Sequence, residues 1–335
     1  MQSDICEVLH IRYPVFQGGM AWIADGKLAA AVSEGGGLGI VASGNAPADY
    51  VREQIQIART QTDKPIGVNV MLLSPFADEV AEMAAKEKVA VITTGAGNPS
   101  KYMERWKNAG IHVIPVVASA SMAKLMTRPG ASALIAEGGE SGGHVGELTT
   151  MVLVPQVRDA TDLPVVAAGG IADGRGFAAA IMLGACGIQM GTRFLSAQEC
   201  NIHPVYRDKI LKAGERCTMV TGKRLGHPVR SLRTAFSRNY EKAEYAGASD
   251  EPASPVVLSR YRKIALRLKN TLEEYGVSQI VESVNGKRRL ATEYVDCDLY
   301  RYLSAPQENV SLFHGSYLTN YSWGEITLGE LTDTL

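Results

Sequence analysis

One ten-residue stretch, EGGESGGHVG at 137–146, combines a histidine with five glycines. Glycine has no Cβ atom, so the main chain of such a stretch can come close to a ligand. His144 carries the side chain whose charge changes nearest to neutral pH, and it can therefore move a proton in a reaction. A surface loop that happens to hold a histidine is the alternative, and the position of the stretch in the fold must decide between the two.

Two other glycine-rich turns suggest a phosphate site. AAGGIADG at 167–174 and MGT at 190–192 each follow an apolar run. Gly169 and Gly170 leave backbone N–H groups open to an anion, and a helix that begins after Asp173 would add the partial positive charge of its N-terminus. Turns that simply reverse the chain are the alternative, but two of them at the expected places favour phosphate.

Polar residues also end several of the apolar runs. FQGGMAW (16–22) follows the first run, Asn69 interrupts GVNVML, TTGAGNP (93–99) follows the fourth and Glu137 ends the sixth. A polar side chain within a buried strand needs a partner. These residues suit a flat ring with hydrogen-bonding edges and a phosphate tail, but they do not distinguish FMN from a sugar phosphate. The chain has neither GxGxxG after its first run nor GxxxxGK[ST], which disfavours dinucleotide and nucleoside-triphosphate folds.

Eight short apolar runs alternate with helical-length intervals in about 195 residues. Runs that are apolar on both faces are typical of parallel strands, and this alternation predicts a (β/α)8 barrel, with an open doubly wound sheet as the alternative. The predicted helices include 48–61, 76–88, 99–110 and 173–185. The predicted strands are 13–17, 37–43, 65–72, 89–95, 112–119, 132–138, 163–170 and 187–194.

The barrel prediction places His144 after the sixth strand. Active sites of such barrels lie at the C-terminal ends of the strands, and phosphate often binds after strands seven and eight. His144 is therefore the predicted catalytic residue. The remaining histidines have weaker contexts and are interpreted as structural; they are His10, His112, His203, His227 and His314.

Composition excludes several classes of protein. The formal net charge is −1 over 335 residues, so no overall field draws the chain to nucleic acid or membrane. The N-terminus lacks the pattern of a signal peptide, and no apolar run approaches the ~20 residues of a membrane span. The five cysteines form no CxxC pair. We expect a cytoplasmic protein with reduced thiols and no metal site.

The chain changes character near residue 250. Residues 1–250 hold 29 of the 34 glycines, whereas the last 85 residues hold nine of the 22 aromatic residues. GASDEPASP resembles a linker. We therefore expect a barrel domain at 1–248, a linker at 249–256 and a mainly helical extension of different origin at 257–335.

The motifs of the first part resemble one enzyme family. Five segments are similar to segments of the FMN- and NAD(P)H-dependent enoyl-acyl-carrier-protein reductases of bacterial fatty-acid synthesis. They are YPVFQGGMAWIADG, KPIGVNVMLLSP, IAEGGESGGHVGELTTM, VVAAGGIADG and QMGTRF. These FabK-like enzymes belong to the wider nitronate monooxygenase (2-nitropropane dioxygenase) superfamily. The resemblance covers about residues 4–247, and TTGAGNPSKYM favours the reductase branch over the oxygenases.

The resemblance implies a (β/α)8 barrel with FMN at its mouth and NADH or NADPH as electron donor. The implied substrate is an enoyl thioester on acyl carrier protein, the implied assembly is a homodimer, and His144 would be catalytic or would orient the substrate. A nitronate monooxygenase that uses oxygen is the alternative. With the glycines noted above, the expected cofactor-binding residues are Gln17, Gly18, Gly19, Met20, Asn69, Glu137, Gly142, Gly143, Gly169, Gly170, Gly191 and Thr192.

The last part departs from this family. Its sequence resembles the end of the winged-helix DNA-binding domain of some response regulators, with a recognition-type helix and a wing. Residues 256–290 hold eight Lys and Arg but only three Asp and Glu. Residues 291–335 hold one Lys or Arg and seven Asp and Glu. A basic helix of this kind could make weak contacts to nucleic acid, so a DNA-binding regulatory fusion is a further alternative. An amphipathic helix with a solvated charged face is the preferred interpretation.

Overall fold

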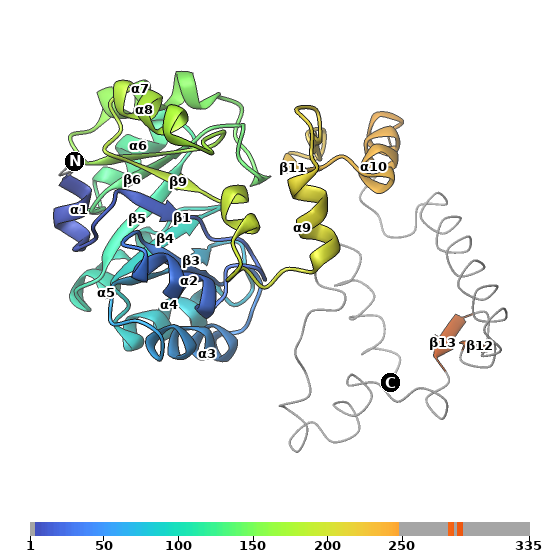
Figure 1. Cartoon of the computed structure of the whole chain (residues 1–335), viewed down its shortest axis with the longest axis horizontal. Coiled ribbons are helices and arrows are strands. Elements are labelled where there is room, and N and C mark those ends of the chain that lie inside the picture. The colour runs from blue at the N-terminus through green and yellow to red at the C-terminus, as the bar shows by residue number, and fades with distance from the viewer. Residues whose placement is uncertain (1–3, 248–280, 285–286, 291–335) are drawn as a thin grey trace, which may run out of the picture. The chain divides into compact units, whose positions relative to one another are not determined.

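The computed structural model describes residues 4–247, 281–284 and 287–290 of the chain (Figure 1). The chain divides into two units, Met1–Ala246 and Gly247–Leu335. The predicted linker at 249–256 and the predicted recognition-type helix lie outside the described residues. No helix in the described part of the chain is long and apolar enough to cross a membrane.

Eight parallel strands of the first unit form a closed barrel. They follow the order β1-β9-β8-β6-β5-β4-β3-β2. A parallel bridge between Phe16 and Leu38 joins the two ends of this row. Across it, Gln17 N–H donates to the carbonyl of Leu38 at 3.0 Å, and Leu38 N–H donates to the carbonyl of Val15 at 2.9 Å. This closure confirms the predicted (β/α)8 barrel and excludes the open sheet.

The barrel strands coincide with the predicted apolar runs. Each is short, and each pairs in parallel register with its neighbours, as between Asn69 and Thr93 or between Glu137 and Ala168. The strands are β1 (Val15–Gln17), β2 (Gly39–Ala42), β3 (Ile66–Met71), β4 (Val91–Gly95), β5 (His112–Val117), β6 (Leu134–Glu137), β8 (Val165–Ala168) and β9 (Gly187–Met190).

Helices follow the strands and surround them in Figure 1. The predicted helices are confirmed, with ends trimmed by a few residues. The short helix α1 (Asp4–Leu9) precedes the barrel. The surrounding helices are α2 (Gly26–Glu34), α3 (Ala48–Arg59), α4 (Ala77–Glu87), α5 (Ser100–Asn108), α6 (Ala120–Thr127), α7 (Thr150–Ala160) and α8 (Gly174–Met182).

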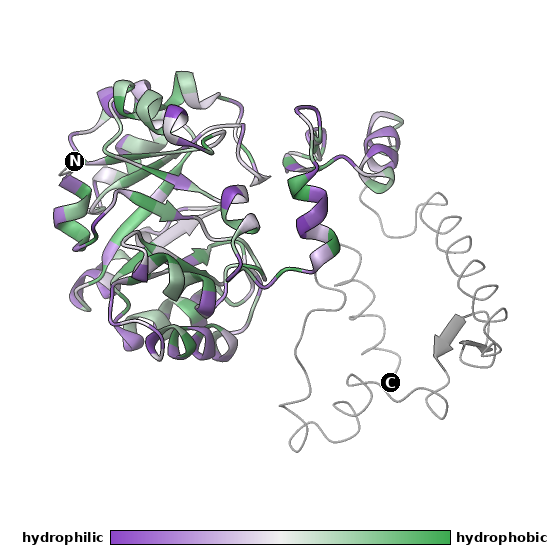
Figure 2. Ribbon diagram, in the orientation of Figure 1, coloured by the Kyte–Doolittle hydropathy of each residue, from purple (hydrophilic) through white to green (hydrophobic). Residues whose placement is uncertain are grey.

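The core has an inner and an outer part. Alternate strand residues pack with one another and with Ile5 and Leu9 of α1, so they fill the barrel interior. They include Phe16, Ile40, Val91, Ile114, Ile135 and Val166. The residues next to them in sequence pack against helices instead. Figure 2 accordingly shows much apolar colour on the barrel strands, whereas helices such as α3 and α5 carry both hydrophilic and apolar bands. This alternation fixes which side chains can reach the barrel interior.

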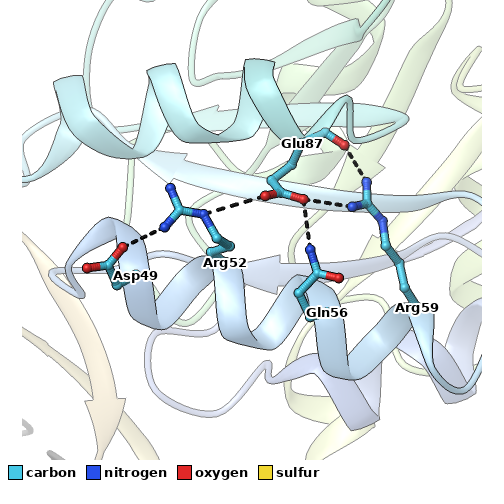
Figure 3. A network of polar contacts seen from close by, with 5 residues as sticks. All are labelled: Asp49, Arg52, Gln56, Arg59 and Glu87. Carbon is cyan, nitrogen blue, oxygen red and sulfur yellow. Dashed lines mark hydrogen bonds and ion pairs between the residues drawn. The ribbon is translucent and has the colours of Figure 1, made fainter. Parts of the chain in front are cut away.

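A polar network joins two neighbouring helices of the outer layer (Figure 3). Glu87 at the end of α4 accepts hydrogen bonds from Arg59 at 2.7 Å and from Gln56 at 2.9 Å. Arg59 also donates to the backbone carbonyl of Glu87, and Arg52 lies 3.5 Å from the carboxylate. Arg52 in turn pairs with Asp49 at 2.6 Å. The donors lie three or four residues apart, so they share one face of α3.

A smaller sheet follows the barrel in sequence. After β9 come the 3₁₀ helix η1 (Thr192–Ser196), α9 (Pro204–Leu211), β10 (Thr218–Thr221), β11 (Val229–Leu232) and α10 (Ala235–Tyr245). Strand β7 (Gly143–His144), which lies between β6 and α7 in sequence, pairs with β11 to complete the antiparallel order β10-β11-β7. The sequence did not predict this sheet.

The described residues of the second unit form one hairpin. Strand β12 (Val281–Val284) pairs antiparallel with β13 (Lys287–Leu290). This hairpin lies within the segment whose resemblance implies a wing. The resemblance of this part of the chain to a winged-helix domain stays a prediction.

Candidate active site

Four polar side chains point into the barrel at the C-terminal ends of its strands. They are Asn69 on β3, Thr93 on β4, Glu137 on β6 and Gln189 on β9, and the residue before each packs outward with the helices. Asn69 Nδ2 donates to Thr93 Oγ1 at 3.0 Å, which supplies the partner that the sequence required. A polar ring therefore lies above the apolar filling of the barrel, at the end where such barrels carry their active sites.

The turn after β1 lies directly against this ring. A Cβ atom on Gly19 would lie 2.5 Å from Cβ of Asn69, and one on Gly18 would lie 3.1 Å from Cδ of Gln189. A side chain at Gly19 would displace Asn69. These two glycines are thus needed for the ring to form, and the exposed backbone of Gly19 lies at the barrel mouth.

Gly169 and Gly170 form a turn that only glycine adopts without strain. Their φ angles are +102° and +70°, in the region that L side chains avoid. A Cβ on Gly169 would lie 2.8 Å from Thr150 Oγ1 and 2.9 Å from the carbonyl of Gly138. The backbone N–H of Gly170 donates to no group in the described part of the chain. This turn suits an anion held by main-chain donors.

The helix after this turn is already capped. The Asp173 carboxylate accepts hydrogen bonds from the N–H groups of Arg175 at 2.9 Å and Gly176 at 3.3 Å. The hydrogen bond from the Arg175 side chain, and then those from the backbone, lower the pKa of Asp173 to about 2. We expected the N–H groups at the start of this helix to help bind a phosphate. Those of Arg175 and Gly176 already bind the Asp173 carboxylate, so these two donors do not support that expectation.

The second predicted anion-binding turn starts a short helix without a side-chain cap. Gly191 precedes η1, which begins at Thr192. A Cβ on Gly191 would lie 3.7 Å from Sδ of Met20, and a Cβ on Gly142 would lie 4.0 Å from Oγ1 of Thr192. The turns after β1, β6 and β9 thus meet around the start of η1. Barrels of this class often bind phosphate at such a short extra helix.

His144 lies on an ordered strand rather than in a free loop. Its partner across β7 and β11 is Val229, and the partner of Gly143 is Arg230. The N–H of the next residue, Val145, donates to the carbonyl of Pro228 at 3.1 Å. The side chain of His144 is exposed. The strand therefore holds the imidazole at the mouth in contact with solvent, where a substrate can reach it.

Arg230 joins this strand to the glycine-rich loop. Its Nε and Nη2 donate to the carbonyl of Gly139 at 3.1 and 2.9 Å, and its Nη1 donates to Thr218 Oγ1 at 3.1 Å. A guanidinium holds several acceptors in a fixed arrangement. Arg230 thus fixes the position of the loop that carries His144.

Among the described residues at the mouth, Glu137 is the titratable group whose pKa departs most from its ordinary value. Burial raises the pKa of its carboxyl group to about 7, and the nearby Ser141 hydroxyl opposes this change. A carboxyl group with such a pKa exchanges its proton near neutral pH. Glu137 therefore has chemistry of its own, beyond the cofactor contact that the sequence predicted.

Glu140, the second acid of the loop, has a structural role. Its carboxylate accepts from the N–H of Thr150 at 2.9 Å and from Thr150 Oγ1 at 3.0 Å. Thr150 is the first residue of α7. Glu140 thus places a negative charge at the N-terminus of α7, where it stabilises the helix.

Gln17 uses its side chain within the protein. It is fully buried, its Nε2 donates to the carbonyls of Gly18 at 2.6 Å and Ile40 at 3.2 Å, and its Oε1 accepts from Ile40 N–H at 3.1 Å. Both amide hydrogens are therefore engaged. The predicted cofactor contact of Gln17 stays a prediction.

Sequence reasoning assigned no individual role to three residues that shape the mouth, although Thr93 belongs to the TTGAGNP stretch noted at the end of the fourth run. Thr93 and Gln189 complete the polar ring, and the argument that identified Asn69, a polar residue inside an apolar strand, applies equally to both. Arg230 gave no such signal, because nothing in a short segment such as GHPVR predicts that its strand pairs with the histidine loop.

These features fit a flavin phosphate and ring. The free N–H of Gly170, the left-handed turn that excludes a Cβ, and the uncapped start of η1 are each features that suit an anion. Gly143 has no atom within 4 Å of the position that a Cβ would take, which leaves open space beside His144. The polar ring then offers hydrogen bonds to the edge of a planar group.

Comparison with known proteins places the chain in one family. The family model described as nitronate monooxygenase matches residues 2–87 and 74–279, so the match extends beyond residue 247, where the resemblance in the sequence ended. A probable nitronate monooxygenase of Staphylococcus aureus (strain JH9) is 32% identical over an aligned length of 314 positions, gaps included, and the match covers 80% of this chain and 88% of that protein.

Another relative is named for a different substrate. It is the (3aS,4S,5R,7aS)-5-hydroxy-7a-methyl-1-oxo-octahydro-1H-indene-4-carboxyl-CoA dehydrogenase of Rhodococcus jostii (strain RHA1), 39% identical over 241 residues, which are 72% of this chain and 68% of that protein.

Solved structures agree with this placement. FabK from Thermotoga maritima is 53% identical with a TM-score of 0.72, and the match covers 73% of this chain and 79% of FabK. Nitroalkane oxidase from Streptomyces ansochromogenes is 28% identical with a TM-score of 0.66, covering 82% and 89%. The chain therefore belongs to the nitronate monooxygenase family and is a flavin-dependent oxidoreductase.

Proposed function

We propose that this protein is an FMN-dependent enoyl-acyl-carrier-protein reductase. The observation that carries the proposal is the 53% identity to FabK across the barrel, against 28% to nitroalkane oxidase and 32% to the staphylococcal relative. The relatives named as carboxyl-CoA dehydrogenases add support, because their names also specify a thioester.

The residues of the mouth suit this reaction. Gly170, Gly191 and Thr192 would hold the FMN phosphate, and Asn69 and Glu137 would face the ring. When bound, FMN supplies the redox chemistry, passing a hydride from NADH or NADPH to the β-carbon of the enoyl thioester.

The chain itself must supply a proton and stabilise charge. Hydride addition at C3 places negative charge on C2 and the thioester oxygen, so C2 needs a proton and the oxygen needs a hydrogen-bond donor. His144 is the exposed titratable group on the strand beside the open space at Gly143. We assign it one of these two roles, and Arg230 the role of positioning its strand.

A direct assay tests the proposal. Purified protein should be yellow and should oxidise NADH or NADPH only when crotonyl thioester is present, with butyryl thioester as the product. A flavin-free protein, or NAD(P)H oxidation that is independent of the thioester and ends in hydrogen peroxide, would refute it.

Nitronate oxidation is the second candidate, favoured by the family model and by the names of several relatives. It needs oxygen but no nicotinamide donor. Oxygen consumption with propyl-2-nitronate in the absence of NAD(P)H, together with no thioester reduction, would favour this function instead.

A further inference from the structure

The segment that carries β10, β11 and α10 differs in charge from the barrel. Residues 204–247, here called the basic lobe, hold ten Lys and Arg against four Asp and Glu, whereas residues 1–203 hold 15 against 19. The whole chain has a net charge of only −1. Positive charge is therefore concentrated in one part of the first unit.

Two of the four acids of the basic lobe are already engaged within it. Glu244 is buried, and its carboxylate accepts from the N–H groups of Gly222 at 2.9 Å and Arg224 at 2.7 Å. Asp208 is paired with Lys212 at 3.2 Å. The other two acids, Glu215 and Glu241, directly precede Arg216 and Lys242 in sequence, so the cations of the lobe outside these two arrangements are offset by at most these two acids.

One face of α10 presents cations together with an aromatic ring. Arg238, Lys242 and Tyr245 lie four and three residues apart and are all exposed, with Tyr245 68% accessible. The buried Ser237 and Glu244 lie on a different side of the helix. Figure 2 shows the helix as mostly hydrophilic. Arginine and tyrosine are the residue types enriched where proteins bind one another.

Two more exposed cations lie near the start of the helix. Arg233 directly precedes Thr234, the N-cap of α10, and its N–H donates to the carbonyl of Cys217 at 2.6 Å, which brings Arg216 alongside. We call Arg216, Arg233, Arg238, Lys242 and Tyr245 the cationic face. Its four cations form no ion pair with any residue that the structure describes, whereas eight ion pairs lie on the barrel.

The cationic face is connected directly to the candidate active site. Val229 on β11 pairs with His144, and β11 continues for three more residues to Leu232, next to Arg233. A strand rises about 3.3 Å per residue, so Val229, the partner of His144, lies about 10–13 Å from Arg233, the nearest cation of the face. A macromolecule bound to the face would thus hold a flexible arm beside His144.

We propose that the cationic face docks an acidic carrier protein that delivers the thioester substrate on its prosthetic arm, an inference that rests on the proposed function. A small anionic carrier such as coenzyme A would be bound by cations clustered at one place. The cations of this face are instead spread along α10 and over the adjoining end of the β10–β11 hairpin. An extended array of one sign fits an extended acidic surface and accelerates its encounter.

Kinetics with three carriers of one acyl group test the inference. The substrates are crotonyl-acyl carrier protein, crotonyl-CoA and the neutral crotonyl-N-acetylcysteamine, each with the full-length FMN-loaded protein. The test variant is Arg238→Glu with Lys242→Glu. The control variant is Lys27→Glu with Lys124→Glu, which reverses two exposed cations on the barrel helices α2 and α6.

We expect the test variant to raise KM for the carrier-protein substrate by about tenfold or more, with kcat unchanged and with normal turnover of the neutral thioester. Added salt should raise the same KM of the unmodified protein. Equal KM values in test and control variants would overturn the inference, and so would an equal loss with crotonyl-CoA, because the face would then recognise any anion.

Direct binding separates this inference from the proposed function. Failure of the unmodified protein to reduce even the neutral thioester would refute the function. Fluorescence anisotropy of labelled holo-acyl carrier protein still reports docking in that case. Binding that weakens about tenfold in the test variant and not in the control supports the inference, and binding that is absent or unchanged overturns it.

Discussion

Replacing Glu137 by glutamine should remove a pH dependence of stability that the fold imposes. Glu137 ends β6 and points into the barrel, where burial raises the pKa of its carboxyl group from 4.5 to about 7. The folded protein therefore binds this proton more tightly than the unfolded chain does. Its stabilising effect is complete below pH 4.5, is lost as the pH rises toward 7, and stays lost above 7.

The size of the effect follows from the pKa difference. A shift of one pKa unit corresponds to about 1.4 kcal/mol, so a carboxyl group that titrates at 4.5 when unfolded and at about 7 when folded loses about 3 kcal/mol between low pH and about pH 8. Glutamine keeps the shape and remains neutral throughout. The unmodified protein should thus lose about 3 kcal/mol relative to Glu137→Gln over this range.

Urea unfolding of the flavin-free protein at a series of pH values measures this difference. Glu104→Gln on α5, an exposed glutamate, is the matched control and should follow the unmodified protein. Taking the difference between proteins cancels the contribution of histidines and other shared groups. Parallel curves for the unmodified protein and Glu137→Gln would refute the argument that the barrel interior holds this proton.

Three further predictions concern other parts of the first unit. His144→Ala should retain FMN absorbance but slow thioester reduction by ~10²–10⁴-fold, as measured by single-turnover kinetics; unchanged turnover would exclude the assigned role. Gly169→Ala should lower unfolding free energy by about 2–4 kcal/mol and weaken FMN binding, because φ is +102° and the new Cβ would lie 2.8 Å from Thr150 Oγ1; calorimetry and flavin titration check both effects. Glu87→Ala should cost about 1 kcal/mol in urea unfolding without changing turnover, because it removes the acceptor shared by Arg59 and Gln56.

The barrel could be predicted because each of its strands carries its own signal. An apolar run such as that around Val68 and Val70 identifies a buried parallel strand without knowledge of its partners. The position of Asn69 within that run also identified a polar site. These features are local, so a single sequence shows them.

The sheet around His144 could not be predicted, because it depends on pairing between distant segments. Gly143 and Arg230 are 87 residues apart in sequence, and β7 has only two residues. A strand of that length in a glycine-rich stretch has no periodicity to detect. The cap on α8 was missed for a different reason: Asp173 was interpreted as the residue before a helix, and its own carboxylate was not counted as the occupant of the helix start.

The pairing of β7 with β11 makes the basic lobe part of the candidate active site. Glycines on both sides of His144 would otherwise leave the imidazole free to move, and catalysis by proton transfer requires a fixed position within hydrogen-bond reach of the substrate. Val229 pairs with the histidine, and Arg230 binds the loop at Gly139, so the residues that fix the imidazole come from beyond the eighth strand. A chain that ended after β9 would keep the polar ring and the anion-binding turns but would lose this fixation. The segment that follows the barrel therefore fixes the residue to which we assign a role in thioester reduction.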